Sequence, residues 1–400
     1  MVTKQKVFLT ILISISLTFL STAPSIGESK KPIKIGVLLP LSGVIAQSGV
    51  ESRDGIEMAA REKGTILGRP IELIVEDTQV KPDVGVSKAE KLVHKDGCVG
   101  LLGIISSGVA LAVGQNIERL KVPLLVTGSM TTKLYSFHKW VFRSGQLIDD
   151  QTVRANVFGI LSRPDLKNRT YYVLCSDFTW GHDASECFIK LAKEKGIKIY
   201  NENYDKAPVT TTDWASYITK IKASGVDGAY ICVFTNSIPV FTKQAYDFGF
   251  LPKNKVVSAA APGPRELEAG AQSCHGIVTS TVWSWDLNTA ASDQWEKKYW
   301  EKYKPTIPSH MAVQSYVGAM NLFNGIEKAR STDVDKIANA LRGISFDGPY
   351  GVVRISPKDN SARSDAFLIE TTRAPSNPFR ANVIQKVLHH FKAEELGPPE

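Results

Sequence analysis

The sequence predicts an α/β protein built from two doubly wound parallel sheets. Two observations predict this class. Short apolar runs alternate with segments whose apolar residues recur at helical spacing, and this alternation starts again near residue 150. Runs such as Ile33–Pro40 are apolar almost throughout, which is typical of parallel strands buried on both faces. The 400 residues are enough for two domains of ordinary size.

The composition argues against several other classes. Hydrophobic residues make up 43% of the chain and charged residues 22%, which are globular values and not those of a disordered chain. The formal net charge is +8, but the basic residues are scattered and no nucleic-acid-binding motif accompanies them. We therefore expect no nucleic-acid partner. No apolar stretch reaches the 18 or more residues of a membrane span.

The N-terminus has the pattern of a secretory signal peptide, residues 1–27. Lys4 and Lys6 precede an apolar run, Val7–Leu20, and small and polar residues follow it. A membrane anchor is the alternative, but the 14 residues of this run span only about 21 Å as a helix. We expect cleavage after Gly27 and a periplasmic mature protein.

The first strand–helix series runs from residue 33 to residue 126. Apolar runs that end at proline, glycine or polar residues predict its strands, and apolar residues at helical spacing predict the helices between them. The expected strands are Ile33–Pro40, Pro70–Glu76, Val99–Ile105 and Val122–Val126, and the expected helices are Ser52–Lys63, Ser87–Lys95 and Ala110–Leu120.

The second series begins near residue 150 and shows the same two patterns. Its expected strands are Arg169–Cys175, Ile197–Tyr200, Gly228–Phe234, Val256–Ala260 and Gly276–Val282, and its expected helices are Asp150–Leu161, Asp183–Lys195, Trp214–Ala223 and Pro239–Gly249. Three further helices are expected over Thr289–Tyr303, His310–Arg330 and Val334–Gly343. A closing hairpin is expected from Val352–Ile355 and Ala366–Ile369.

Loops at the carboxyl ends of the strands predict a binding site, because ligands of parallel sheets bind at that edge. In the first series these loops are small and rich in hydroxyl groups, Ile105–Ala110 and Thr127–Thr132. In the second series Trp180, Phe234 and Trp283 follow strand ends and suit an apolar or flat ligand. Ordinary helix caps, polar turns and core packing are the structural alternatives for these residues.

No catalytic, metal-binding or cofactor-binding motif is present. The chain lacks G-x-S-x-G, Walker, G-x-G-x-x-G, C-x-x-C and H-E-x-x-H patterns, so we expect neither enzymatic activity nor a cofactor. His182 is the one histidine expected in a cleft, and no nucleophile is tied to it by sequence. The five cysteines are expected to be mainly buried thiols, with one disulfide as the alternative.

Over residues 33–370 the chain resembles type I periplasmic binding proteins of the branched-chain amino acid and amide group. The motifs that carry the resemblance are Lys34–Pro40 with Ser42-Gly43, Asp54-Gly55, Glu76-Asp77-Thr78, Gly103–Ala112, Phe142-Arg143, Asp177 with Trp180-Gly181, and Phe346–Gly351. The resemblance implies two doubly wound lobes joined by a three-crossing hinge near residues 147, 281 and 348. The N-terminal lobe is then 28–147 plus 282–348, the C-terminal lobe 148–281 plus 349–390, and the tail 391–400.

The resemblance also implies which residues hold the ligand. Ser107, with the strand-end loop Gly128–Thr131, matches the part of the first lobe that holds a ligand carboxylate. Trp180 and Phe234 match aromatic residues that close over the ligand from the second lobe. With Trp283, the expected ligand-binding set is Ser107, Gly128, Ser129, Met130, Thr131, Trp180, Phe234 and Trp283.

Two departures from the family pattern bear on the ligand. Ser48 stands where the amino acid binders have an aromatic residue. Ser258–Pro264, near Ala260, contains no acid at the place where the family neutralises the ligand ammonium. A buried ammonium without a counter-charge is unfavourable. We therefore expect a carboxylate, amide or aromatic acid without an amine, unless Glu266 or Asp177 supplies the charge.

The function implied by the resemblance is that of the extracytoplasmic solute-binding receptor of an ABC importer. Such a receptor traps a small carboxylate, amide or amino-acid-like ligand between two hinged lobes, and ABC permease subunits in the membrane recognise it. We expect a monomer without a cofactor. A ligand-sensing regulator or receptor domain of the amide-sensor type is the alternative.

Overall fold

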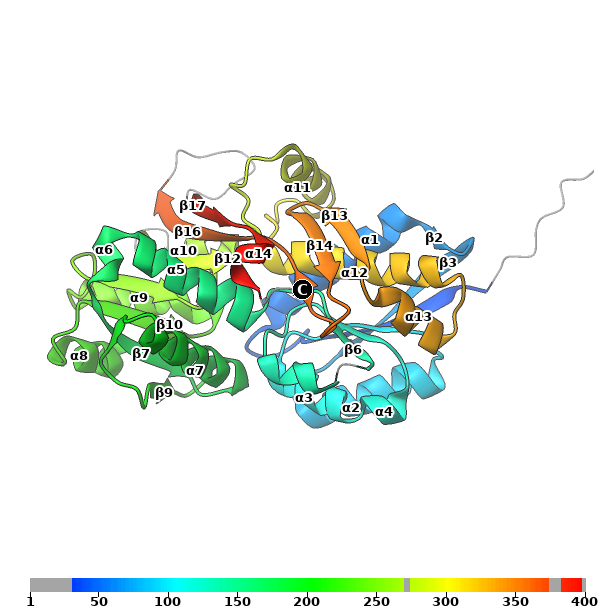
Figure 1. The fold of residues 1–400 in the computed structure, drawn as a ribbon, viewed down its shortest axis with the longest axis horizontal. Coiled ribbons are helices and arrows are strands. Elements are labelled where there is room, and N and C mark those ends of the chain that lie inside the picture. The colour runs from blue at the N-terminus through cyan, green and yellow to red at the C-terminus, as the bar shows by residue number, and fades with distance from the viewer. Residues whose placement is uncertain (1–30, 138, 270–273, 374–382, 398–400) are drawn as a thin grey trace, which may run out of the picture.

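The structure is a computed structural model that describes residues 31–137, 139–269, 274–373 and 383–397, so the expected signal peptide lies outside it. Figure 1 shows two lobes side by side, each with helices packed around its own sheet. Most strand pairs in both sheets are parallel. The predicted α/β class with two parallel-sheet lobes is confirmed.

The sheet of the first lobe has the strand order β2-β3-β1-β4-β5-β6. All neighbours are parallel except β2, which pairs antiparallel with β3. The strand bounds are β1 (Ile33–Leu39), β2 (Thr65–Ile66), β3 (Arg69–Asp77), β4 (Leu101–Gly103), β5 (Leu124–Val126) and β6 (Val141–Arg143). Because β1 lies between β3 and β4, the chain winds outwards from it in both directions, and the strand-end loops of β1 and β4 meet at one edge.

The first-lobe helices connect or cover these strands. Their bounds are α1 (Ala46–Lys63), α2 (Pro82–Glu90), the π-helix η1 (Lys91–Lys95), α3 (Ser107–Gln115), α4 (Ile117–Leu120) and the 3₁₀ helix η2 (Thr132–Phe137). Later segments add α11 (Ala290–Tyr303), α12 (His310–Ala329) and α13 (Val334–Leu341). Helix α1 begins six positions before the expected Ser52 because its first two turns bury small side chains, among them Ser48 and Gly49, and not an apolar stripe.

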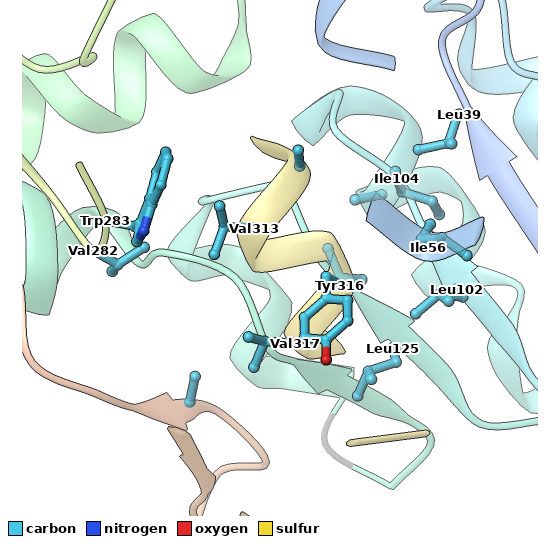
Figure 2. Close-up of a cluster of buried hydrophobic side chains, with 14 of the residues drawn as sticks. Leu39, Ile56, Leu102, Ile104, Leu125, Val282, Trp283, Val313, Tyr316 and Val317 are labelled. Atoms are coloured by element: carbon cyan, nitrogen blue, oxygen red, sulfur yellow. The ribbon is translucent and has the colours of Figure 1, made fainter. Parts of the chain in front are cut away.

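Helix α12 is central to the core of this lobe. Figure 2 shows Val313, Tyr316 and Val317 of this helix close to sheet residues such as Leu125. These side chains belong to one buried cluster and are at most 3% exposed. A Cβ atom on Gly55 of α1 would lie 2.0 Å from the carbonyl oxygen of Ala312. Only glycine therefore permits this close approach of α1 to α12.

The second sheet has the order β17-β16-β12-β11-β10-β7-β8, and β9 also pairs with β7. The strands are β7 (Thr170–Ser176), β8 (Lys198–Ile199), β9 (Asp205–Ala207), β10 (Gly228–Cys232), β11 (Lys255–Ser258), β12 (Val278–Thr281), β16 (Ala366–Arg373) and β17 (Val383–Phe391). Its helices are η3 (Ile148–Val153), α5 (Arg154–Ser162), α6 (Pro164–Lys167), α7 (Thr179–Glu194), α8 (Ala215–Ala223), η4 (Thr235–Ser237), α9 (Ile238–Asp247) and α10 (Pro264–Ala269). The four buried cysteines, Cys98, Cys175, Cys232 and Cys274, are free thiols.

The expected closing hairpin is wrong. β14 (Gly351–Ile355) pairs with β13 (Ser345–Gly348) and β15 (Ala362–Arg363) in a separate antiparallel sheet. β16 pairs instead with β12 and β17. The glycines near residue 350 thus form a hairpin turn between β13 and β14, and the chain enters the second sheet only at β16, later than the third crossing expected near residue 348. The limits of the two lobes otherwise stay predictions.

The last described residues pack onto the second lobe, although His389 and His390 are exposed. Strand β17 contains His389 and His390 and runs antiparallel to β16. His390 Nε2 lies 2.6 Å from Asp365 Oδ2. A final short helix, α14 (Ala393–Leu396), buries Leu396 to 1% exposure. This segment therefore completes the edge of the second lobe.

Glutamine side chains tie the three crossings of the hinge together. Gln146 follows β6 and donates through Nε2 to Thr152 Oγ1 at 2.7 Å and to the Ser280 carbonyl at 3.3 Å. Gln151 donates to Ser364 Oγ at 2.7 Å. These bonds join segments that lie far apart in the sequence, and they hold the two lobes at one pivot.

Candidate functional site

A cavity lies between the two lobes, at the edge where the parallel strands of both sheets end. Its volume is about 680 Å³ when the solvent at its mouth is included. The lining residues come from strand-end loops and helix starts of both lobes and from the hinge. They are Ile45, Ser48, Val80, Ile105, Ser106, Ser107, Gly128 and Met130 of the first lobe, Phe178, Trp180, Val233, Phe234, Thr235, Ala259, Ala260 and Ala261 of the second, and Gln146, His310 and Met311 beside the hinge.

The wall from the first lobe is shaped by an unusual backbone turn after β4. Ile104 has φ +59°, a conformation that a β-branched residue rarely adopts. Its N–H donates to the Leu38 carbonyl at 2.7 Å, and its carbonyl accepts from the amides of Gly128 at 3.3 Å and Ser129 at 2.9 Å. This turn directs the following segment, Ile105 to Ser107, along the cavity.

Two serines open helix α3 at this wall. Ser106 is the N-cap, and its hydroxyl accepts from the Val109 amide at 3.5 Å. Ser107 is 2% exposed, and its hydroxyl accepts from Ser129 Oγ at 3.2 Å. Amides in the first turn of a helix have no carbonyl of a preceding turn to bond, and the helix dipole is positive there. This end of the cavity therefore suits an oxyanion.

One aspartate holds the loops beside α1 that complete this wall. The Asp77 carboxylate accepts from the amides of Leu41 and Gln79, both at 2.8 Å, and from Ser42 Oγ at 2.6 Å. Burial alone would raise the pKa of Asp77, but these hydrogen bonds lower it below its usual value. Val80, which lines the cavity, directly follows this pinned segment.

Aromatic side chains form the wall from the second lobe. Phe178 caps α7 after β7, and Phe234 caps η4 after β10; these strands are neighbours, so their strand-end loops lie side by side. The Phe178 and Phe234 rings stack with centroids 4.0 Å apart and planes 26° apart. The Trp180 ring lies 5.7 Å from Phe178. Within the described residues, the buried Trp180 Nε1 has no hydrogen-bond partner.

The charge pattern of the cavity is simple. Among its described lining residues there is no aspartate, glutamate, lysine or arginine. Burial lowers the pKa of His310 to about 4, so this imidazole is neutral at neutral pH. Asp177 is exposed and pairs with His182 at 2.8 Å, and neither Asp177 nor Glu266 is among the lining residues. The apolar segment 259–261 occupies the position that the resemblance assigns to the acid that neutralises a ligand ammonium.

Three polar residues connect the lobes beside the cavity, and we call them the latch: Thr131, Lys133 and Asp183. Thr131 and Lys133 follow β5 in the first lobe, and Asp183 lies on α7 in the second. The Asp183 carboxylate accepts from Thr131 Oγ1 and pairs with Lys133 Nζ at 2.8 Å. Asp183 is 6% exposed. The latch is thus a charged contact that separation of the lobes would break.

The structure brings together most of the predicted site residues. Those that line the cavity are Ser107, Gly128, Met130, Trp180 and Phe234. Ser129 lies behind them and donates to Ser107, and Thr131 belongs to the latch. Trp283 is 1% exposed and donates through Nε1 to Ser292 Oγ at 2.8 Å, so it packs in the core and we leave it out of the proposed site.

The sequence pattern did not predict several of the lining residues. Phe178 directly follows Asp177 in the quoted motif, and its position at a helix cap was the available signal. Gln146 and His310 lie at the crossings, where no strand end points to them. The histidine at the cavity is therefore His310 and not His182, because the crossing before α12 brings the start of that helix to the hinge.

Comparison with known proteins gives one family and several similar folds. The model of a family described as periplasmic binding protein matches residues 32–375. Leu/Ile/Val-binding protein homolog 7 of Brucella abortus (strain 2308) is 25% identical over 335 residues, which cover 79% of this chain and 82% of that protein.

Two solved structures share the fold over nearly their whole length. One is the solute binding protein of an ABC transporter from Rhodopseudomonas palustris BisB5 in complex with 3,4-dihydroxybenzoic acid, with TM-score 0.83, 21% identity, and coverage of 90% of this chain and 98% of that one. The other is a leucine binding protein from Thermotoga maritima, with TM-score 0.79, 22% identity, and coverage of 91% and 100%.

Proposed function

Because this chain belongs to the periplasmic binding protein family, we propose that it is the extracytoplasmic solute-binding receptor of an ABC importer. The observation that carries the proposal is the cavity between the lobes, whose opposite walls come from the strand-end loops of two different sheets. A ligand there contacts both lobes at once, so it stabilises their closed arrangement.

The first lobe holds the acidic end of the ligand. The amides of Gly128 and Ser129 already donate to Ile104, so they are engaged in shaping the loop. The carboxylate instead meets the start of α3, where Ser106 and Ser107 line the cavity and the helix dipole is positive. This arrangement neutralises a carboxylate without a lysine or an arginine.

The second lobe covers the rest of the ligand. Trp180 and the stacked pair of Phe178 and Phe234 offer flat apolar faces. Burial of a large apolar group contributes about 1.5–3 kcal/mol. The Trp180 N–H adds a donor for an acceptor atom of the ligand.

The ligand is a carboxylate, or a related amide, without an ammonium group. The two solved structures described above differ on this point, because one is in complex with a dihydroxybenzoic acid, which has no ammonium group, and the other is a leucine binding protein. In this chain the segment 259–261 is entirely alanine, and no carboxylate lies among the described lining residues. An ammonium there would lose its hydration without gaining a counter-charge.

Closure and release follow from the hinge. Lobe rotation about the Gln146 and Gln151 crossings brings the aromatic wall onto the ligand and forms the latch. Closure excludes water, which strengthens the hydrogen bonds to the carboxylate. Membrane permease subunits then receive the closed form. We place the protein in the periplasm as a monomer and assign it no reaction. In the described part of the chain, no helix is long and apolar enough to cross a membrane.

Native mass spectrometry of the purified protein, followed by a thermal-shift screen of aromatic acids, amides and amino acids, tests the proposal. We expect a small acid to raise the unfolding temperature and to compact the protein in small-angle scattering. Tight binding of leucine would overturn the argument from the missing acid. Identical scattering with and without every bound solute would refute the hinged receptor and favour the sensor alternative or a different function.

A further inference from the structure

Gln146 presents one unused acceptor to the cavity. Its side-chain amide donates to Thr152 Oγ1 at 2.7 Å and to the Ser280 carbonyl at 3.3 Å. Because a carbonyl oxygen only accepts, the second bond determines which end of the amide is nitrogen. Both N–H groups are therefore engaged. Among the described residues, none donates to Gln146 Oε1, although the side chain lines the cavity and is only 4% exposed.

His310 lines the same cavity as this acceptor. His310 and Gln314 are one turn apart on α12 and so share a face of the helix. Gln314 Oε1 accepts from the Gln146 backbone amide at 3.1 Å, which places that face against Gln146. The His310 imidazole lines the cavity and makes no hydrogen bond to any described residue. A neutral imidazole offers one N–H donor and one acceptor nitrogen.

We infer that Gln146 Oε1 and the His310 imidazole together recognise a hydroxyl group on the ligand, so that the preferred ligands are hydroxylated carboxylic acids. This inference rests on the proposed function and specifies its ligand class. A hydroxyl donates to the glutamine oxygen and accepts from the imidazole N–H, which satisfies both orphan groups. An ammonium has no acceptor for the imidazole N–H and brings an uncompensated charge, and an unsubstituted acid leaves both groups desolvated without partners.

Calorimetry with two matched ligand sets tests the inference on the intact mature protein. The first set is benzoate, 3-hydroxybenzoate and 4-hydroxybenzoate. The second is 4-methylpentanoate, its 2-hydroxy derivative and leucine. In at least one set we expect the hydroxylated acid to bind about tenfold or more tightly than its parent acid. In the second set leucine should bind more weakly than the hydroxy acid.

Variants of His310 test whether its imidazole causes the preference for the hydroxylated acid. His310→Phe keeps a flat ring but removes both nitrogens, so it should abolish the preference for the hydroxylated acid over its parent acid. His310→Gln restores a donor and an acceptor and should recover part of the preference. Met311→Leu is the matched control, since Met311 also lines the cavity but carries no hydrogen-bonding nitrogen, and it should keep the preference.

The outcomes separate this inference from the proposed function. Parent and hydroxylated acids that bind equally well overturn the hydroxyl subsite and leave the receptor for acids intact. A hydroxyl preference that survives in His310→Phe also overturns the subsite. Failure of a folded protein to bind any acid of either set, together with binding of a different solute class in the screen, overturns the proposed ligand class and the inference with it.

Discussion

Replacement of Asp183 by asparagine tests whether the latch controls closure. The substitution keeps the size of the side chain but removes its charge. In the structure the carboxylate accepts from Thr131 Oγ1 and pairs with Lys133 Nζ at 2.8 Å. Both partners belong to the first lobe, whereas Asp183 belongs to the second. Loss of the charge should therefore weaken the closed arrangement more than either lobe by itself.

The contacts give the size of the effect. A buried hydrogen bond to a charged group contributes about 1.5–3 kcal/mol. The Lys133 side chain is 57% exposed, so its ion pair adds only about 0–1 kcal/mol. Asparagine retains one acceptor oxygen and part of the Thr131 bond. We expect a net loss of about 1–2 kcal/mol, which is roughly a 5- to 30-fold weaker apparent affinity if the ligand is retained only by the closed form.

Asp205 provides a matched control. Its carboxylate also accepts from a hydroxyl, Tyr172 at 2.6 Å, and also pairs with a lysine, Lys220 at 2.8 Å. All three residues lie in the second lobe. Asp205→Asn therefore removes a similar carboxylate without touching the contact between lobes, and ligand affinity should stay within about twofold.

Calorimetry with the best acid from the screen measures the affinities, and small-angle scattering measures closure in its presence. Asp183→Asn should bind more weakly and remain more extended at equal ligand concentration. Wild-type affinity in Asp183→Asn refutes the latch, and an equal loss in both variants shows that a general loss of stability, and not closure, is responsible.

Three further predictions concern other parts of the molecule. Trp180→Ala should weaken acid binding about tenfold or more, because it removes a large apolar face from the cavity wall, and an unchanged affinity by calorimetry removes Trp180 from the site. Gly55→Ala should destabilise the protein by about 1–3 kcal/mol or more in urea unfolding, because its Cβ would lie 2.0 Å from the Ala312 carbonyl oxygen. Wild-type stability of this variant would show that α1 and α12 can move apart. The pKa of Asp77 is lower in the folded protein than the unfolded value of about 4, so its contribution to stability is present above about pH 4 and is lost as the pH falls through the folded pKa. Acid should therefore destabilise the wild type more than Asp77→Asn. Parallel curves of unfolding free energy against pH would contradict this.

Local sequence predicted the strands that are buried on both faces and the helices whose apolar residues recur at helical spacing. Ile33–Pro40 and Gly228–Phe234 are apolar on both faces, and they became the central strands β1 and β10. The hydroxyl-rich and aromatic loops that follow such strands predicted Ser107, Trp180 and Phe234, which all line the cavity. The physical basis is topological, since parallel strands place their following loops at one edge.

Pairing between distant segments was not predictable in the same way. Strand β14 pairs with β13 and β15 and not with β16, because turn glycines specify a hairpin but not which later strand completes the sheet. Trp283 follows a strand end as Phe234 does, yet its indole packs beside Trp295 in the core. An aromatic residue after a strand turns inwards or outwards according to the helix that covers it, and the sequence pattern does not contain that information.

The sequence by itself determined the α/β class, the two sheets and the chemistry available at their edges. Local apolar patterns show which strands are buried on both faces and which helices bury one face. Tertiary structure alone decided that Thr131 meets Asp183, that His310 and Gln146 line one cavity, and that none of the described residues lining this cavity is a carboxylate. Each of these depends on where two lobes and three crossings meet, and contacts over such separations arise only when the whole chain has folded.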